Sequence, residues 1–180
     1  MKNSICITGL LSQYTENLTK EVSIALGTNF ASLSSMIEFD LVDVSETINV
    51  CGIDYYKGIV SKKLKELSSF DNTTIYANYY MLQYDVCRNI VKNDLLTIYI
   101  DVGEKLYNKK LQDENLTELE MKLEKGAYKV RNKYFSKNAD IVIKAKDKTQ
   151  AQIIENIIKT VFKYYSKEVK KNEARKKSSK

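Results

Sequence analysis

The 180-residue sequence contains no histidine, no proline, no tryptophan and only three cysteines. Without histidine, a Ser-His-Asp or Cys-His triad, a histidine-ligated zinc site and proton transfer by an imidazole are excluded. Cys6, Cys51 and Cys87 are odd in number, lie far apart and form no CxxC pair. We therefore expect reduced, mostly buried thiols in a cytoplasmic protein rather than disulfides or a metal site.

Long hydrophobic runs are missing as well. No stretch approaches the roughly 18 apolar residues of a membrane span, and the apolar run near the N-terminus is too short for a signal peptide. We expect no membrane partner. The hydrophobic content of 43% is nevertheless enough for one domain with a substantial core.

The net charge of +6 is concentrated at one end of the chain. Residues 163–180 contain eight basic side chains against two glutamates, whereas residues 1–162 contain equal numbers of basic and acidic side chains. We therefore divide the chain into a domain over residues 1–162 and a basic tail over 163–180, whose helix end frays into disorder. The tail could bind nucleic acid weakly through phosphate contacts, but a solvated extension without a ligand explains the same charges.

Apolar patterns along the chain alternate between those of strands and those of helices. Continuous apolar or β-branched runs predict strands at residues 5–8, 73–77, 95–102 and 140–143. Helical spacing predicts helices at 16–26, 55–67, 86–91 and 151–165, together with a polar helical region at 104–134. Gly27 stands where the first helix would be capped, and residues 39–44 fit neither pattern. This alternation indicates an α/β domain with a parallel sheet flanked by helices on both faces.

The first predicted strand is followed by Gly9, a loop and a helix, which is the layout of a phosphate-binding loop. Such loops use glycines to turn backbone N–H groups toward an anion at a helix N-terminus. A lysine then reaches the terminal phosphates, and a hydroxyl helps to hold Mg²⁺. Residues 9–16 read GLLSQYTE. Gly9 fits this layout, but a tight strand-to-helix turn would also account for it.

At this loop the sequence resembles the shikimate kinase family of small P-loop kinases, and the resemblance extends over residues 3–162. It rests on Leu-Gly at the end of the first helix, TIYA at 74–77, LTIYIDV at 96–102 and RNKYFSKNAD at 131–140. The last of these is similar to the family's Arg-x-x-x-Tyr-x-x-x-Ala-Asp segment. The resemblance implies a three-layer P-loop-kinase-like fold and, in an intact member, ATP-dependent phosphorylation of shikimate.

The residues that bind phosphate in this family are replaced. Thr15 stands at the position of the phosphate-binding lysine and Glu16 at that of the Mg²⁺-binding hydroxyl. A carboxylate there repels an anion 4 Å away by about 1 kcal/mol in water. Ser12 and Tyr14 replace loop glycines, and a bulky tyrosine resists the positive φ that an anion-binding loop requires.

The family's substrate-binding residues are altered too. Ser32 and Ser34 align with an Asp-x-Asp pair that positions Mg²⁺ and shikimate, and Lys57 aligns with a substrate-clamping arginine. Lysine keeps the charge but lacks the bidentate fork of arginine. Arg131 alone matches a substrate-contacting position. The family's triple glycine is replaced by the larger residues Asn78, Tyr79 and Tyr80.

Several of these residues also have a simpler explanation. Arg131 could bind a carboxylate, or it could form an ion pair at the surface or at a helix end. Asp40 and Asp43 could replace the lost pair as cation ligands, although their spacing is common by chance. The tyrosines around the former substrate site could fill it with aromatic rings, or could line a new pocket or a protein-binding surface. These are Tyr14, Tyr79, Tyr80 and Tyr84.

The replacements together predict a non-catalytic, shikimate kinase-like protein. Phosphoryl transfer depends on positioning of the reactants and on neutralisation of their charge by metal, lysine and arginine. The residues that supply these functions in the family are replaced at several positions of this chain at once. We expect no cofactor, and a protein partner at the tyrosine-rich cleft. The alternative is a divergent kinase that binds Mg-ATP and acts on another hydroxyl compound with a lysine from elsewhere, such as Lys20, Lys57 or Lys109.

Overall fold

A five-stranded parallel sheet forms the centre of the molecule. The computed structural model describes residues 2–41, 43–113 and 118–178. Its strands lie in the order β2-β3-β1-β4-β5, and every neighbouring pair is parallel. They are β1 (Ile5–Gly9), β2 (Asn29–Ser32), β3 (Thr73–Tyr76), β4 (Leu96–Asp101) and β5 (Ile141–Lys144).

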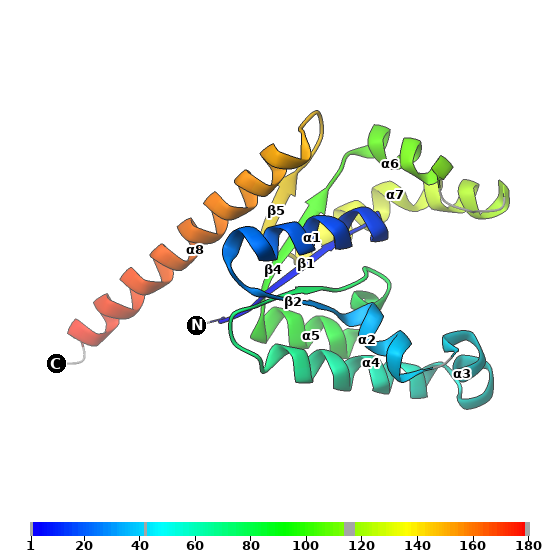
Figure 1. The fold of residues 1–180 in the computed structure, drawn as a ribbon, viewed down its shortest axis with the longest axis horizontal. Helices are drawn as coiled ribbons and strands as arrows, with labels where there is room; N and C mark the ends of the chain where they lie inside the picture. Colours follow the sequence, from blue (N-terminus) through cyan, green and yellow to red (C-terminus); the bar gives the residue numbers. More distant parts are fainter. Residues whose placement is uncertain (1, 42, 114–117, 179–180) are drawn as a thin grey trace.

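Helices cover both faces of this sheet (Figure 1). On one face α1 and α8 pack together, and on the other face α4 packs against α5, with α7 against β4. The α-helices are α1 (Ser12–Leu26), α2 (Leu33–Asp40), α3 (Val44–Cys51), α4 (Ile53–Ser68), α5 (Asp85–Asp94), α6 (Glu104–Lys110), α7 (Glu118–Asn138) and α8 (Gln150–Ser178). Short 3₁₀ turns, η1 (Met81–Gln83) and η2 (Leu111–Asp113), precede α5 and follow α6. The predicted three-layer α/β class is confirmed.

The central strands are the most deeply buried part of the chain. β1 and β3 are buried at every position and β4 at all but its last, as expected for a parallel sheet with helices on both faces. The register aligns Ile7 with Tyr76 on β3 and with Ile98 on β4. Because parallel strands end at one edge, the segments that follow β1, β3 and β4 meet there, where open α/β sheets place their sites.

The structure adds detail in three parts of the sequence that were left without a prediction or were predicted only coarsely. Residues 29–32 form β2, which we did not predict because this edge strand contains one large apolar residue, Phe30, and is only partly buried. Residues 39–44, which fitted neither pattern, include the end of α2 and the start of α3. The polar helical region at 104–134 is divided into α6, η2 and α7.

Helices α1 and α8 are both longer than predicted. α1 begins at Ser12 instead of residue 16, and Gly27 caps it in the left-handed conformation, with φ 65°, as predicted. α8 continues past residue 165 through the basic segment to Ser178 and projects from the body of the domain (Figure 1). Among the helices described, none is long and apolar enough to cross a membrane.

The cysteines agree with expectation at two positions and differ at the third. Cys6 and Cys87 are buried, and burial raises the pKa of their thiols to about 12 and about 11. Cys51 is exposed, so the expectation of a buried thiol is wrong there. It is the last residue of α3, a helix in which no residue is buried.

Candidate functional site

The turn between β1 and α1 is shorter than a phosphate-binding loop. Only Leu10 and Leu11 separate the strand from the helix, and both side chains are buried in the core. Ser12, Tyr14, Thr15 and Glu16 therefore all lie within the first turns of α1. No residue from 9 to 16 has a positive φ, so the backbone does not form the N–H nest that surrounds a phosphate.

Gly9 is required by close packing inside this turn. A Cβ atom at this position would lie 2.5 Å from Thr15 Oγ1 and 3.2 Å from the carbonyl oxygen of Ile100. Thr15 is fully buried, and its hydroxyl has no hydrogen-bond partner among the residues that the structure describes. The side chain at the position of the family's phosphate-binding lysine thus points into the core.

The outer residues of the turn connect it to the segment that follows β3. Asn78 Nδ2 donates to Ser12 Oγ at 3.0 Å, and Asn78 Oδ1 accepts from the backbone N–H of Tyr80 at 3.0 Å. Asn78 therefore fixes the position of Tyr79 and Tyr80, which with Asn78 itself replace the triple glycine.

Tyr14, in the first turn of α1, is half-buried. Burial, followed by the charge of Glu21, raises the pKa of its hydroxyl.

Those tyrosines hold Arg131. Tyr79 is only 2% exposed, and its ring centroid lies 4.0 Å from that of Tyr80 and 5.9 Å from that of Phe135. The Arg131 guanidinium lies over both tyrosine rings, at 5.4 Å from Tyr79 and 5.6 Å from Tyr80, and donates to the Tyr79 hydroxyl at 3.3 Å. The cleft next to Arg131 is therefore occupied by aromatic rings.

Glu124 on α7 completes this arrangement, and sequence reasoning missed it. Its carboxylate accepts hydrogen bonds from Tyr80 at 2.9 Å, from Tyr107 at 2.8 Å, and from Arg131, with which it forms an ion pair. Burial alone would raise the pKa of the Glu124 carboxyl, but these three donors and the nearby charge of Arg131 lower it below its ordinary value. We call Tyr79, Tyr80, Tyr107, Glu124 and Arg131 the Glu124 cluster.

Two of the other predicted cleft residues, Ser32 and Lys57, have local structural contacts, and the third, Ser34, has none at its hydroxyl among the described residues. Ser32 caps α2 by accepting from the Ser35 N–H at 3.2 Å. The Ser34 hydroxyl is buried and has no partner within the described part of the chain. Lys57 pairs with Asp54 at 2.8 Å, and its ammonium lies 5.7 Å from the centroid of the Tyr84 ring.

The two aspartates considered as cation ligands are engaged elsewhere. Asp40 forms an ion pair with Lys63 at 2.7 Å, and Asp43 caps α3 by accepting from the Glu46 N–H at 2.9 Å. Over residues 2–41, 43–113 and 118–178, no group of three or more acidic or cysteine side chains is placed to hold a metal ion.

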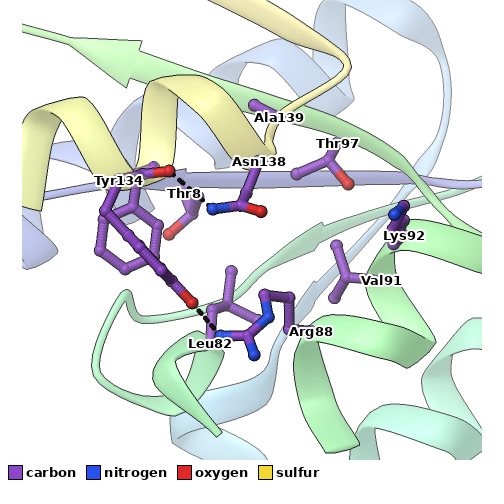
Figure 2. A pocket seen from close by; sticks show the side chains of 10 residues that line it. Thr8, Leu82, Arg88, Val91, Lys92, Thr97, Tyr134, Asn138 and Ala139 are labelled. Atoms are coloured by element: carbon purple, nitrogen blue, oxygen red, sulfur yellow. Dashed lines mark hydrogen bonds between the residues drawn. The ribbon is translucent and has the colours of Figure 1, made fainter. Parts of the chain in front are cut away.

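Two of the cavities in the described part of the chain lie beside β4 or just after its end. A small one of about 20 Å³ lies between β1, β4, α5 and α7, and the side chains of Thr8, Thr97 and Arg88 line it (Figure 2). It is large enough for one water molecule. A wider, open depression of about 650 Å³ lies after the ends of β4 and β5. Four lysines line it together with Glu104 and Asp147, namely Lys105, Lys109, Lys146 and Lys148.

Solved structures with the same arrangement of strands and helices identify the fold. Shikimate kinase from Acinetobacter baumannii, solved in complex with shikimate, superposes with a TM-score of 0.74 over 90% of this chain and 94% of that chain, at 14% identity. Shikimate kinase from Aquifex aeolicus superposes with a TM-score of 0.71 over 88% and 95%, at 19% identity. The fold is that of shikimate kinase.

Other P-loop kinases share the shikimate kinase fold more distantly. Dephospho-CoA kinase from Campylobacter jejuni has a TM-score of 0.54 over 92% of this chain and all of that one, at 14% identity. No family model matches the sequence, and no curated protein matches it by sequence either. At these identities the likeness concerns the fold alone. The sequence resemblance to shikimate kinases therefore predicted the fold correctly.

Proposed function

We propose that this protein is a non-catalytic, shikimate kinase-like binding or regulatory module that uses its remodelled cleft. The observation that supports this most strongly is the two-residue β1–α1 turn, in which Thr15 is buried against Gly9. Phosphoryl transfer requires a cradle of N–H groups and cations around the transferred phosphate. This turn offers apolar side chains and the carboxylate of Glu16 in their place.

Calorimetric titration with Mg-ATP tests the loss of nucleotide binding. We expect no heat of binding at millimolar nucleotide, because the turn has neither a lysine nor backbone N–H groups arranged around an anion. Shikimate kinase from Acinetobacter baumannii, titrated in the same buffer, serves as the control. A micromolar dissociation constant for Mg-ATP would overturn the proposal.

The cleft surface is where we expect a protein partner to bind. Tyr80 is 47% exposed and lies next to buried Tyr79, so the surface combines an aromatic anchor with hydroxyl groups. Tyrosines supply a large contact area at low entropic cost, which is typical of binding hot spots. Binding through this surface should be lost in Tyr80→Ala and kept in a chain truncated after residue 166, which retains Tyr164 and Tyr165 against the core. The reverse result would assign binding to the basic tail and support the nucleic-acid hypothesis.

A divergent kinase remains the second candidate because one observation favours it. The open depression of about 650 Å³ has four lysines on its walls, so it could attract an anionic ligand. One of them, Lys109, is among the lysines that the sequence suggested for this role. Phosphate release from ATP, measured with a panel of hydroxyl metabolites, should be undetectable under our proposal. Release that disappears in Lys109→Ala would favour the kinase.

A further inference from the structure

The carboxylate of Glu124 has the surroundings of a bound ligand. It accepts hydrogen bonds from two tyrosine hydroxyls, at 2.9 Å from Tyr80 and 2.8 Å from Tyr107, and pairs with the guanidinium of Arg131. Hydrogen bonds to charged groups are stronger than those between neutral groups. Both carboxylate oxygens are thus satisfied by donors that would bind any carboxylate presented in this orientation.

These donors are held in place by contacts that do not involve Glu124. The Arg131 guanidinium lies over the adjacent rings of Tyr79 and Tyr80, and the Tyr107 ring packs on Tyr128 at a centroid distance of 4.8 Å. The pair is also largely shielded from water, because the Glu124 side chain is 15% exposed and that of Arg131 24%. The receptor groups would therefore keep their arrangement if the carboxylate left.

The three donors come from three separate parts of the fold. Tyr80 follows β3, Tyr107 belongs to α6, and Arg131 lies on α7, seven residues beyond Glu124 and on the same side of the helix. A single carboxylate therefore ties together the segments that border the cleft. Because Glu124 is part of α7, it competes with free carboxylates at a high effective concentration.

We propose that Glu124 is an internal ligand that occupies a carboxylate-recognition site and keeps the cleft closed. This inference rests on the proposed binding function, and it names the chemistry of the ligand that would open the cleft. A ligand must present a carboxylate to Arg131, Tyr80 and Tyr107, and must bind well enough to displace Glu124. Ligands without a carboxylate would leave the cleft closed.

Replacement of the carboxylate from solution tests this inference. Glu124→Ala removes the internal ligand and leaves space for a small monocarboxylate next to Arg131. Sodium acetate should raise the Tm of this variant in a saturable manner, by about 3 °C at tenfold excess over its dissociation constant. Sodium chloride at equal ionic strength should not. Wild type should show no such rise, because its site is already occupied.

The double variant Glu124→Ala, Arg131→Ala is the matched control, because it removes the guanidinium that would receive acetate. If acetate raises the Tm of this control or of wild type as much as that of Glu124→Ala, the inference is overturned. The same holds if Glu124→Ala shows no response. Should Glu124→Ala fail to fold, the titration is repeated in trimethylamine N-oxide, which favours the compact state and carries no carboxylate.

The internal-ligand inference and the proposed function can be refuted separately. An enzyme that binds Mg-ATP would overturn the proposal of a non-catalytic module and leave the acetate response of Glu124→Ala unchanged. Absence of that response, with no binding of Mg-ATP, would overturn only the internal-ligand inference.

Discussion

The β1–α1 turn and the Glu124 cluster lie at the same edge of the sheet, but they are filled in different ways. The turn is closed by apolar packing, with Leu10 and Leu11 in the core and Thr15 against Gly9. The cluster is closed by polar contacts, in which Glu124 satisfies an arginine and two tyrosine hydroxyls. Asn78 connects the two regions through Ser12.

This difference determines which region a ligand could still use. At the turn, a phosphate would have to displace buried side chains and change the backbone conformation, because no residue from 9 to 16 has the positive φ of an anion nest. At the Glu124 cluster, a ligand would have to replace one carboxylate by another, and the donors are already in place. Under our proposals, the Glu124 cluster is therefore the region at which a ligand could still be recognised.

The largest expected effect concerns the packing of the turn. Gly9→Ala places a Cβ atom 2.5 Å from Thr15 Oγ1 and 3.2 Å from a backbone oxygen that cannot move freely. We expect the free energy of unfolding to fall by about 2 kcal/mol, as for other overpacked cores. Urea denaturation followed by circular dichroism measures this change.

Gly126→Ala is the matched control for this prediction. Gly126 lies within α7, and a Cβ atom there would meet nothing within 4 Å. Alanine should therefore stabilise the helix by about 0.5–1 kcal/mol. If Gly9→Ala were as well tolerated as Gly126→Ala, the turn would be looser than the structure shows, and the contrast between the two regions would fail.

A smaller effect of opposite sign is expected at Thr15. Its hydroxyl is buried without a hydrogen-bond partner in the described residues, which is unfavourable for stability. Thr15→Val keeps the shape of the side chain and removes the hydroxyl, so we expect a gain of about 1 kcal/mol in the free energy of unfolding. In an intact phosphate-binding loop this position would be polar and accessible.

Thr8→Val is a useful comparison, because the Thr8 side chain faces the small cavity of Figure 2, which has room for one water molecule. If that hydroxyl binds a water molecule, Thr8→Val should be less favourable than Thr15→Val. A loss of stability in Thr15→Val would show that its hydroxyl has a partner, and the turn would have to be considered polar.

Sequence reasoning was most successful for the sheet and least successful for the cleft. Four of the five strands were predicted because buried parallel strands are continuous apolar runs, as in Leu96–Asp101. The resemblance to shikimate kinases also located Arg131 and Tyr79–Tyr80 near the cleft. It did not indicate Tyr107 or Glu124, since neither lies in a segment on which the resemblance rests.

Glu124 illustrates the physical reason for this limit. It lies in a helix rich in charged residues, where a glutamate is usually solvated, and nothing in its neighbours along the chain distinguishes it. Its partners Tyr80 and Tyr107 lie 44 and 17 residues away, so only the folded arrangement brings them to one carboxylate. The thirteen tyrosines of the sequence pointed to aromatic side chains in this cleft, but not to their arrangement around an acid.

The smallest expected effect is a pH dependence that separates the Glu124 cluster from surface ion pairs. The pKa of the Glu124 carboxyl is lowered in the folded protein, so its stabilising contribution is present above the ordinary glutamate pKa of about 4.5 and is lost as the pH falls further. The difference in Tm between wild type and Glu124→Gln should therefore be constant near neutral pH and decrease below about pH 4.5.

Glu155→Gln is the control, because Glu155 pairs with Lys159 at 2.6 Å on the exposed surface. Its effect is small at any salt concentration and should decrease further in 1 M salt, which weakens ion pairs between exposed side chains, whereas the effect of Glu124→Gln should persist because tyrosine rings shield the pair from solvent. If both differences vanish in salt, Glu124 is an ordinary surface residue, and the cleft is held closed by its aromatic rings alone.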